Sequence, residues 1–225
     1  MIIFTVAGLD VQMFALIFLT QVFAEPDVQE LWLPNEPRRI ELTVAYLQEH
    51  RTTPLSEAEL QGMMIPRMVV LHWTAGPTVK SAYSVFSSAQ LRGRSELQIS
   101  SLNVSAHYVV DREGNIFQLL DAQRIARHCI GLNHLSIGIE NVGGTKELPL
   151  TQEQVNSNVA LIRYLTGRYP ITHVLGHYEY QLFEEHPYFD EAHANYRTIK
   201  QDPGVDFMNA VRGELADLPL NGAPK

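Results

Sequence analysis

The chain has few of the residues that mark several protein classes. Among its 225 residues there is one cysteine, Cys129. A single thiol excludes an internal disulfide framework and a cysteine-rich zinc site. Basic residues are also scarce, since 17 lysines and arginines stand against 25 aspartates and glutamates, for a formal net charge of -8. A broad contact with nucleic-acid phosphates needs a basic surface, so this balance argues against a nucleic-acid partner.

The chain also has no internal repeat and no apolar run of comfortable membrane-spanning length. Its most apolar segment, residues 11–24, is uncharged and ends in Val-Phe-Ala. That length and ending suit a signal peptide better than a membrane span. Residues 1–10 contain no lysine or arginine, where a signal peptide normally has a basic segment, so a buried N-terminal helix is the alternative. We expect residues 1–24 to be a signal peptide, with a periplasmic or secreted mature protein that has no stable membrane span.

Residues 25–66 are polar, with helical stretches. Ile40, Val44 and Leu47 recur at helical spacing and predict one apolar stripe. Ser56 and Glu59 have the spacing of a capping box, which predicts a helix start. Because the apolar content of this segment is thin, we expect it to pack on the main domain as an N-terminal extension.

Strand and helix patterns alternate over residues 67–218. Short apolar runs predict buried strands, two further runs around Gly114 predict a hairpin, and Thr151 with Gln154 forms a capping box that opens a helix. The alternation predicts an α/β fold, a single mixed β-sheet flanked by helices, with residues 219–225 as a frayed tail. The predicted strands are 68–71, 106–110, 116–120, 136–140 and 171–175.

Three polar residues stand where a zinc site could form. His72 and His177 follow predicted strands, and Asp202 precedes Pro203. Two histidines and a carboxylate, with a fourth position open, are typical of a hydrolytic zinc site. Each residue also has a simpler interpretation: a half-buried imidazole for either histidine, with His173 as a competitor for the role of His177. The last helix is predicted to start at Asp202 and Pro203, with Asp202 as its N-cap and proline at the first helical position; one carboxylate oxygen could cap the helix while the other binds metal.

Two charged residues are candidates for proton transfer and charge stabilisation. Glu140 ends an apolar strand, where desolvation would raise its pKa toward the value of a general base. Lys200 lies two residues before Asp202, on the same side of an extended segment, where an ammonium group would stabilise an oxyanion. The alternatives are a surface carboxylate and a solvated lysine.

Five motifs occur in one order between residues 67 and 207. They are His-Trp-Thr-Ala-Gly, Ser-Ala-His-Tyr before an Asp-Arg-Glu-Gly turn, Ser-Ile-Gly-Ile-Glu, Gly-His, and Lys-Gln-Asp-Pro-Gly. In this the chain resembles the zinc-dependent N-acetylmuramoyl-L-alanine amidases of the type-2 amidase family, which includes peptidoglycan recognition proteins and phage amidase lysozymes. The resemblance implies the same mixed α/β fold and one Zn²⁺ on His72, His177 and Asp202, the last at a position where other members have cysteine. It also implies a catalytic glutamate at Glu140 and a catalytic lysine at Lys200.

The activity implied by the resemblance is hydrolysis of the amide between N-acetylmuramic acid and L-alanine of the peptidoglycan stem peptide, in wall turnover or remodelling. The partners would be peptidoglycan or muropeptides, and a monomer is the default state. Two alternatives remain at this stage. One is a non-catalytic peptidoglycan-binding module, and the other is a cytoplasmic amidase that recycles anhydro-muropeptides.

Four further residues are candidates for substrate contact. The resemblance puts His107 and His128 along the cleft, although each could equally be a hydrogen-bonded strand histidine. Trp73 and Tyr178 could form apolar walls, although aromatic residues at strand ends commonly belong to the core. The irregular stretch 179–198 is expected to form a rim of the substrate groove.

Overall fold

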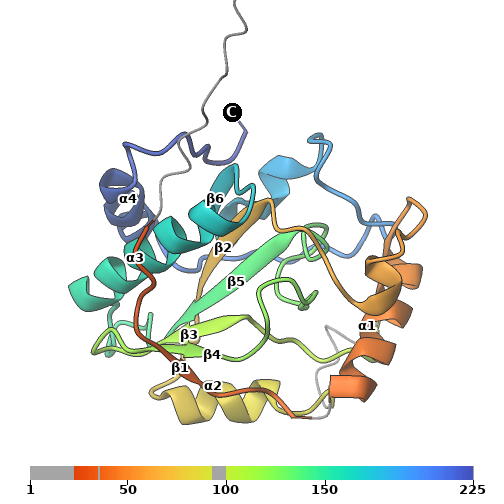
Figure 1. Cartoon of the computed structure of the whole chain (residues 1–225), viewed down its shortest axis with the longest axis horizontal. Helices are drawn as coiled ribbons and strands as arrows, with labels where there is room; N and C mark the ends of the chain where they lie inside the picture. The colour runs from red at the N-terminus through yellow and green to blue at the C-terminus, as the bar shows by residue number, and fades with distance from the viewer. Residues whose placement is uncertain (1–22, 35, 93–99, 225) are drawn as a thin grey trace, which may run out of the picture.

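A computed structural model describes residues 23–34, 36–92 and 100–224 of the chain. Within these residues, six strands form one sheet in the order β1-β4-β3-β5-β2-β6 (Figure 1). The β3–β4 pair is antiparallel and the other four pairs are parallel, so the predicted mixed sheet is confirmed. The strands are β1 (Val28–Glu30), β2 (Met68–Trp73), β3 (Tyr108–Val110), β4 (Ile116–Gln118), β5 (Ser136–Asn141) and β6 (His173–Gly176).

Helices surround the sheet (Figure 1). In the described part of the chain they are α1 (Glu36–His50), α2 (Val79–Phe86), α3 (Gln152–Arg168) and α4 (Val205–Glu214), with 3₁₀ turns η1 (Glu59–Gln61) and η3 (His177–Phe183). Helices α3 and α4 contact each other, and both contribute to the largest core cluster. None of the helices in the described ranges has the length and apolarity needed to cross a membrane.

Local sequence explains where several elements begin. Thr151 accepts a hydrogen bond from the Gln154 backbone N–H, and the Gln154 side chain accepts one from the Thr151 backbone N–H, so the predicted capping box opens α3. The β3–β4 turn has Gly114 at φ 87°, a conformation that a side chain disfavours. The predicted helix and hairpin are therefore confirmed.

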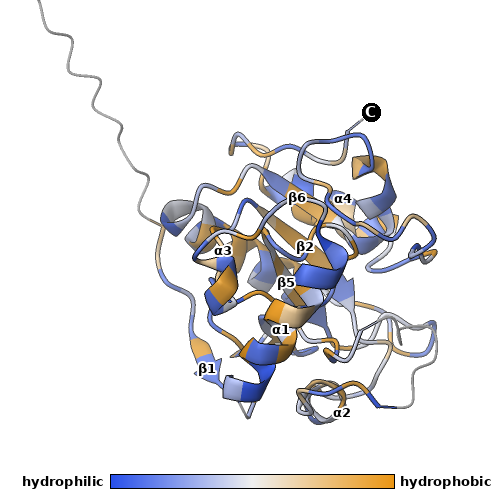
Figure 2. Cartoon of the chain, turned by 90° about the vertical axis from the view of Figure 1, so that its right-hand side faces the viewer, coloured by the Kyte–Doolittle hydropathy of each residue, from blue (hydrophilic) through white to orange (hydrophobic). Residues whose placement is uncertain are grey.

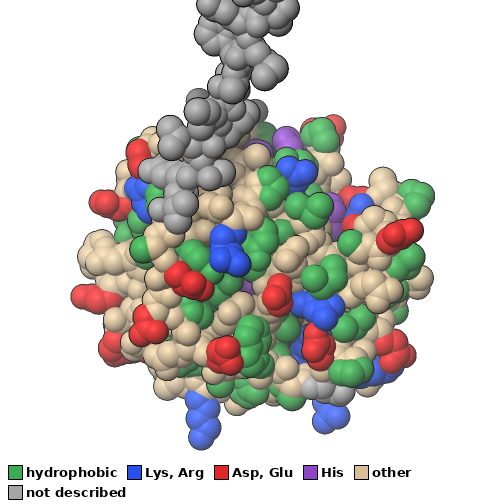
Figure 3. Space-filling model, in the orientation of Figure 1, with side chains coloured by type: hydrophobic (Ala, Val, Ile, Leu, Met, Phe, Trp, Pro, Cys, Tyr) green, Lys and Arg blue, Asp and Glu red, His purple; other side chains and the backbone are tan. Residues whose placement is uncertain are grey.

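The central strand β2 buries both of its faces. Val69 and Leu71 join the core beneath α3 and α4, whereas Met68 and Val70 join a second core cluster on the opposite face. Figure 2 shows hydrophobic residues gathered along the central strands. Because side chains alternate along a strand, His72 lies on the face of Met68 and Val70. On the face seen in Figure 3, acidic and basic side chains are interspersed with hydrophobic ones.

The start of the last helix differs from the prediction. Helix α4 begins at Val205 with Gly204 as its N-cap, at φ 88°. Asp202 is therefore not an N-cap, and Pro203 is not the first helical residue. The carboxylate of Asp202 instead lies against two histidines.

The N-terminal extension adds a strand that the sequence did not predict. β1 pairs in parallel with β4, so residues 28–30 become the edge of the sheet. The buried face of α1 is also rotated from the predicted stripe: Leu47 is buried as expected, whereas Ile40 and Val44 are only partly buried and Leu42 and Tyr46 are enclosed. Both the β1 strand and the buried face of α1 depend on tertiary contacts, since local periodicity predicts neither.

Other predictions near the chain ends and loops have mixed outcomes. Ser56 and Glu59 exchange the expected capping bonds but open only the short turn η1. In the tail predicted to fray, Asn221 pairs with β6 through a backbone bridge to His173. The predicted signal peptide falls almost entirely outside the described residues.

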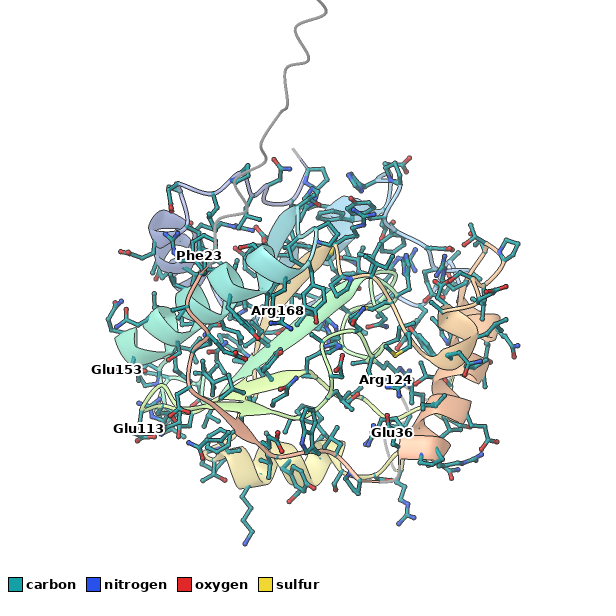
Figure 4. All side chains as sticks on the ribbon, viewed as in Figure 1. Phe23, Glu36, Glu113, Arg124, Glu153 and Arg168 are labelled. Carbon is teal, nitrogen blue, oxygen red and sulfur yellow. The ribbon has the colours of Figure 1, made fainter. Side chains whose placement is uncertain are left out.

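Contacts between the end of α1 and the segment after η3 form what we term the α1 clasp, residues 50–53 with 190–191. The Asp190 carboxylate accepts hydrogen bonds from the side chain of Arg51 (2.6 Å), from the backbone and hydroxyl of Thr52 (2.7 Å each) and from the hydroxyl of Thr53 (2.7 Å). His50 Nδ1 lies 3.0 Å from both carboxylate oxygens of Glu191. The clasp therefore joins the N-terminal extension to the segment that leads into Lys200 and Asp202. A further ion pair joins Glu36 to Arg124 at 2.7 Å (Figure 4).

The clasp predicts a pH-dependent contribution to stability. Burial alone would raise the pKa of Asp190, but the hydrogen bonds from Thr52, Thr53 and Arg51 outweigh burial and lower it. A lowered folded-state pKa gives stability that is present above the unfolded-state value, about 3.9, and is lost as the pH falls below it. Asp190→Asn should lower the free energy of unfolding at pH 7 by about 1–3 kcal/mol, the effect of weakening several hydrogen bonds to a charged, partly buried group.

Chemical denaturation of the Asp190→Asn variant at pH 7 and at pH 3 measures this effect. The difference from the unsubstituted protein should shrink at pH 3. Glu185→Gln is the matched control, because Glu185 is an exposed carboxylate in the same segment. A difference that stays constant with pH would show that the Asp190 charge is not what stabilises the clasp.

Candidate metal centre and cavity

Three adjacent parallel strands end at the same edge of the sheet. In the β2–β5 register His72 lies beside Glu140, and in the β2–β6 register Leu71 lies beside Gly176, the residue before His177. Neighbouring strands are about 4.8 Å apart, so the three polar residues form a short row at the carboxyl ends of β5, β2 and β6. The carboxyl edge of parallel strands is where α/β sheets bind ligands.

His72, His177 and Asp202 converge on one point. His72 Nδ1 lies 2.9 Å from His177 Nδ1 and 3.1 Å from Asp202 Oδ2, and His177 Nδ1 lies 2.9 Å from the same oxygen. All three side chains are buried. The structure therefore brings together the three residues that the sequence indicated as metal ligands.

The geometry of this group fits a zinc ion. Ligands at about 2.0–2.1 Å from a tetrahedral ion lie about 3.3 Å from one another, close to the spacing of the three atoms here. Two imidazole nitrogens and a carboxylate oxygen, each able to offer a lone pair, face one another here. A cation bound between these lone pairs would satisfy all three atoms, and the protein contributes three of the four positions of a tetrahedral site.

Electrostatics keep two members of the group, His177 and Asp202, deprotonated. Burial and the neighbouring His72 lower the pKa of His177 to about 4, against an opposing effect of Asp202. Burial alone would raise the pKa of Asp202, but its hydrogen bonds with His177 and His72 lower it well below the usual range. At neutral pH these two residues are therefore a neutral imidazole and a carboxylate, the forms that bind metal.

Backbone and ion-pair contacts hold the ligands in position. The Tyr178 N–H donates to the Asp202 carbonyl at 3.0 Å, which fixes the Asp202 backbone beside His177. Glu179 accepts hydrogen bonds from the Gly176 N–H at 2.8 Å and from both terminal nitrogens of Arg212. The turn that begins at His177 is thus tied to α4.

A cavity of about 270 Å³ opens beside the metal group. Glu140 and Lys200 both line it, together with His72, His177 and Asp202. A carboxylate, a cation and a metal-binding group on one cavity are the parts needed to attack a carbonyl with water and to stabilise the resulting oxyanion. The other lining residues are Trp73, Thr74, Ala75, Ala82, Val85, Phe86, Val104, Ser105, Arg127, His128, Cys129, Ile130, Asn133, Tyr196 and Thr198.

The four residues predicted to contact substrate separate into two pairs. Trp73 and His128 line the cavity. His107 is fully buried, donates from Nε2 to the Arg124 carbonyl at 2.7 Å and accepts from the Gly138 N–H at 2.9 Å, which favours the hydrogen-bonded strand alternative. Tyr178 packs against the core beneath α4 and is not part of the cavity wall.

His173, the alternative to His177 as a metal ligand, lies at the other end of β6. It is beside Met68 in the register and is therefore remote from the group formed by His72, His177 and Asp202. Part of the stretch predicted as a groove rim belongs to the core instead: Tyr180 and Phe183 are buried beside β2 and β6. Tyr196 and Thr198, at its end, do line the cavity.

Sequence reasoning did not indicate Arg127, Asn133 or Tyr196. Arg127 is buried and donates to the Tyr196 hydroxyl at 2.9 Å and to the Leu102 carbonyl at 2.5 Å. Asn133 accepts from the backbone N–H groups of His128 (2.8 Å) and Cys129 (2.7 Å). No local pattern marks Arg127 or Tyr196, since their side-chain partners come from distant parts of the chain, whereas Asn133 bonds to residues four and five positions earlier.

A second group in the described ranges also has metal-binding side chains: His50, Glu191 and His193. A hydrogen bond from His50 Nδ1 to the two oxygens of Glu191 accounts for its closest contacts, and His193 is exposed. We assign this group to the α1 clasp.

Comparison with known proteins shows what this chain is similar to. Residues 62–205 match a family model described as N-acetylmuramoyl-L-alanine amidase. Among solved structures, the N-acetylmuramoyl-L-alanine amidase LysC from Clostridium intestinale URNW is similar with TM-score 0.54 and 21% identity, over 88% of this chain and 100% of that chain. The endolysin amidase LysCS from the same organism gives TM-score 0.52 and 21% identity, over 86% and 97% of the two chains. A selenomethionine derivative of AmpD gives TM-score 0.50 and 20% identity, over 85% and 96%. A search of curated proteins finds no match.

Proposed function

The chain belongs to the N-acetylmuramoyl-L-alanine amidase family, since the family model spans more than half of its length, and we propose that it is a zinc-dependent member that hydrolyses the amide between N-acetylmuramic acid and L-alanine. The observation that carries the proposal is the convergence of His72, His177 and Asp202 to within 2.9–3.1 Å on a cavity that Glu140 and Lys200 also line. A recognition module needs the cavity but has no use for these five groups together.

His72, His177 and Asp202 would hold the zinc ion. When bound, zinc supplies Lewis acidity, which polarises the scissile carbonyl and makes water a stronger acid. The remaining chemistry belongs to the side chains of the cavity.

Glu140 is proposed as the general base and acid. It sits beside His72 in the strand register and is half-buried, and it lines the same cavity as the ligand group. A carboxylate oxygen of Glu140 would take a proton from the attacking water and pass it to the nitrogen of the departing L-alanine. Without that second transfer the amine would be a poor leaving group.

Lys200 and Trp73 are proposed to orient the substrate. Lys200 lines the cavity near Asp202, and its ammonium group would stabilise negative charge on the carbonyl oxygen as the amide is attacked. Trp73 adds an apolar wall, and Gly144 leaves room for its ring, because a Cβ at residue 144 would lie 2.4 Å from it.

We propose that the substrate is cell-wall peptidoglycan outside the cytoplasm, in keeping with the predicted signal peptide. An N-terminus at Glu25 in the exported protein would test the compartment.

Digestion of purified peptidoglycan sacculi tests the proposed activity. The zinc-loaded protein should release stem peptides that begin with L-alanine, and treatment with a chelator should abolish the release until zinc is restored. Mass spectrometry of the products identifies the bond cleaved. A metal-free protein that binds sacculi equally well and releases nothing after zinc is added would favour a recognition module. Activity on soluble anhydro-muropeptides alone would favour a recycling amidase.

A further inference from the structure

His128 contacts His72 on the side that faces away from His177 and Asp202. Its Nδ1 lies 3.1 Å from His72 Nε2, the ring nitrogen that is not directed at His177 and Asp202. On its other side, His128 Nε2 lies 3.1 Å from the Ser136 carbonyl oxygen and 3.3 Å from the Ser136 hydroxyl oxygen. His128 is therefore a bridge between the β5 backbone and a proposed metal ligand on β2.

The hydrogen positions along this bridge follow from its end at Ser136. A carbonyl oxygen can only accept, and the Ser136 hydroxyl already donates to the Leu132 carbonyl at 2.7 Å. His128 Nε2 must therefore carry the hydrogen that both oxygens accept. In a neutral imidazole the other nitrogen is then an acceptor, so His128 Nδ1 accepts from His72 Nε2.

This arrangement decides which nitrogen of His72 can bind metal. With its hydrogen on Nε2, His72 has a lone pair on Nδ1, the atom that lies 2.9 Å from His177 Nδ1 and 3.1 Å from Asp202 Oδ2. Without His128, the Asp202 carboxylate would favour a hydrogen on His72 Nδ1, because it could then accept a hydrogen bond. That hydrogen would occupy the direction that the metal needs.

We propose that His128 is a positioning residue rather than a substrate contact: it accepts a hydrogen bond from His72 Nε2 and so holds His72 in the tautomer whose Nδ1 binds zinc. The assignment rests on the proposed zinc site. Outer partners of metal-binding histidines commonly fix the tautomer and ring orientation in this way.

The surrounding structure holds the His128 ring in place. Asn133 accepts hydrogen bonds from the backbone N–H of His128 and of the next residue, and donates to the Tyr46 hydroxyl at 2.9 Å. Gly138, in the middle of β5, leaves space for the ring, since a Cβ there would lie 2.8 Å from His128 Cγ. A glycine inside a strand commonly marks such a close approach.

Substitution at His128 tests the proposal through zinc affinity. His128→Phe removes the acceptor and should weaken zinc binding by about 10–100-fold, the usual effect of losing an outer partner of a ligand. His128→Asn places an oxygen near the Nδ1 position and should restore most of the affinity. His173→Phe is the control, because it removes a histidine at the far end of β6. Chelator competition measures the affinities, and circular dichroism in chelator checks that each variant folds.

The tautomer can be read without zinc or any variant. Long-range ¹H–¹⁵N correlation spectra of the metal-free protein at pH 7 should show His72 with its hydrogen on Nε2. A hydrogen on Nδ1, or unchanged zinc affinity in the His128→Phe variant, would overturn the role of His128 and leave the zinc site standing. Failure of the unsubstituted protein to bind zinc would instead overturn the proposed function.

Discussion

Glu140→Gln should leave zinc binding intact and lower the rate of amide hydrolysis by about 10²–10⁴-fold, the range that general acid–base groups contribute. Glutamine keeps the shape of the side chain but cannot take a proton from water. Glu140 is not one of the three converging ligand residues, so the metal content should not change. The measurement is kcat/KM on a muramoyl peptide, with zinc per chain determined by elemental analysis.

A matched control for this variant is Glu113→Gln. Glu113 is an exposed carboxylate in the β3–β4 turn (Figure 4), and it does not line the cavity. The control should have normal activity and normal zinc. Near-normal turnover by the Glu140→Gln variant would remove Glu140 from the mechanism, and loss of its zinc would mean that Glu140 holds the metal site together.

Asp202→Ala should cause the largest loss of zinc affinity, well beyond the about 10–100-fold loss expected for an outer partner. It removes the carboxylate and leaves only the two histidines. A ligand that binds only the folded state stabilises it by about 2.7 kcal/mol at 100 times Kd. At about 2–4 °C per kcal/mol for a chain of this size, zinc should raise the Tm of the unsubstituted protein by roughly 5–10 °C. The Asp202→Ala variant should show almost no such rise.

Asp206→Ala separates loss of a ligand from a general effect on α4. Asp206 is exposed in the first turn of that helix, four residues after Asp202. Because Gly204 is the N-cap, Asp202→Ala removes no cap, and any loss of stability should lie mainly in the zinc-dependent part. Full zinc content in the Asp202→Ala variant would show that the ligand assignment is wrong.

Much of the fold follows from local sequence. The hairpin at Gly114 and the capping box at Thr151 each involve residues within a few positions of one another, so sequence alone predicts them. β1 has no such signal: its three residues are mostly exposed and become a strand because β4 offers an open edge. The predicted first residue of α4 was wrong for a related reason. Asp202 before Pro203 fits a helix start, but in the folded protein its carboxylate lies against two distant histidines.

The candidate site also combines features that local sequence predicts with features that it does not. The motifs around His72, Glu140 and His177 put each residue at or just after the end of a predicted strand, and the sheet confirms those strand ends to within two residues. The sequence could not predict that His128 and His107 would have different environments, because both are histidines beside strands. Their hydrogen-bond partners, which come from other segments, give them different environments.

By itself, the sequence determined the types of side chain, the strands that carry them and the face of each strand on which they lie, because these depend on neighbours a few residues away. Only the tertiary structure decided that β5, β2 and β6 are adjacent, that Asp202 reaches the two histidines, and that His128 stands behind His72. Metal binding depends on lone pairs within about 3.3 Å of one another, and such distances between remote residues are set by the order of strands in the sheet rather than by any local pattern.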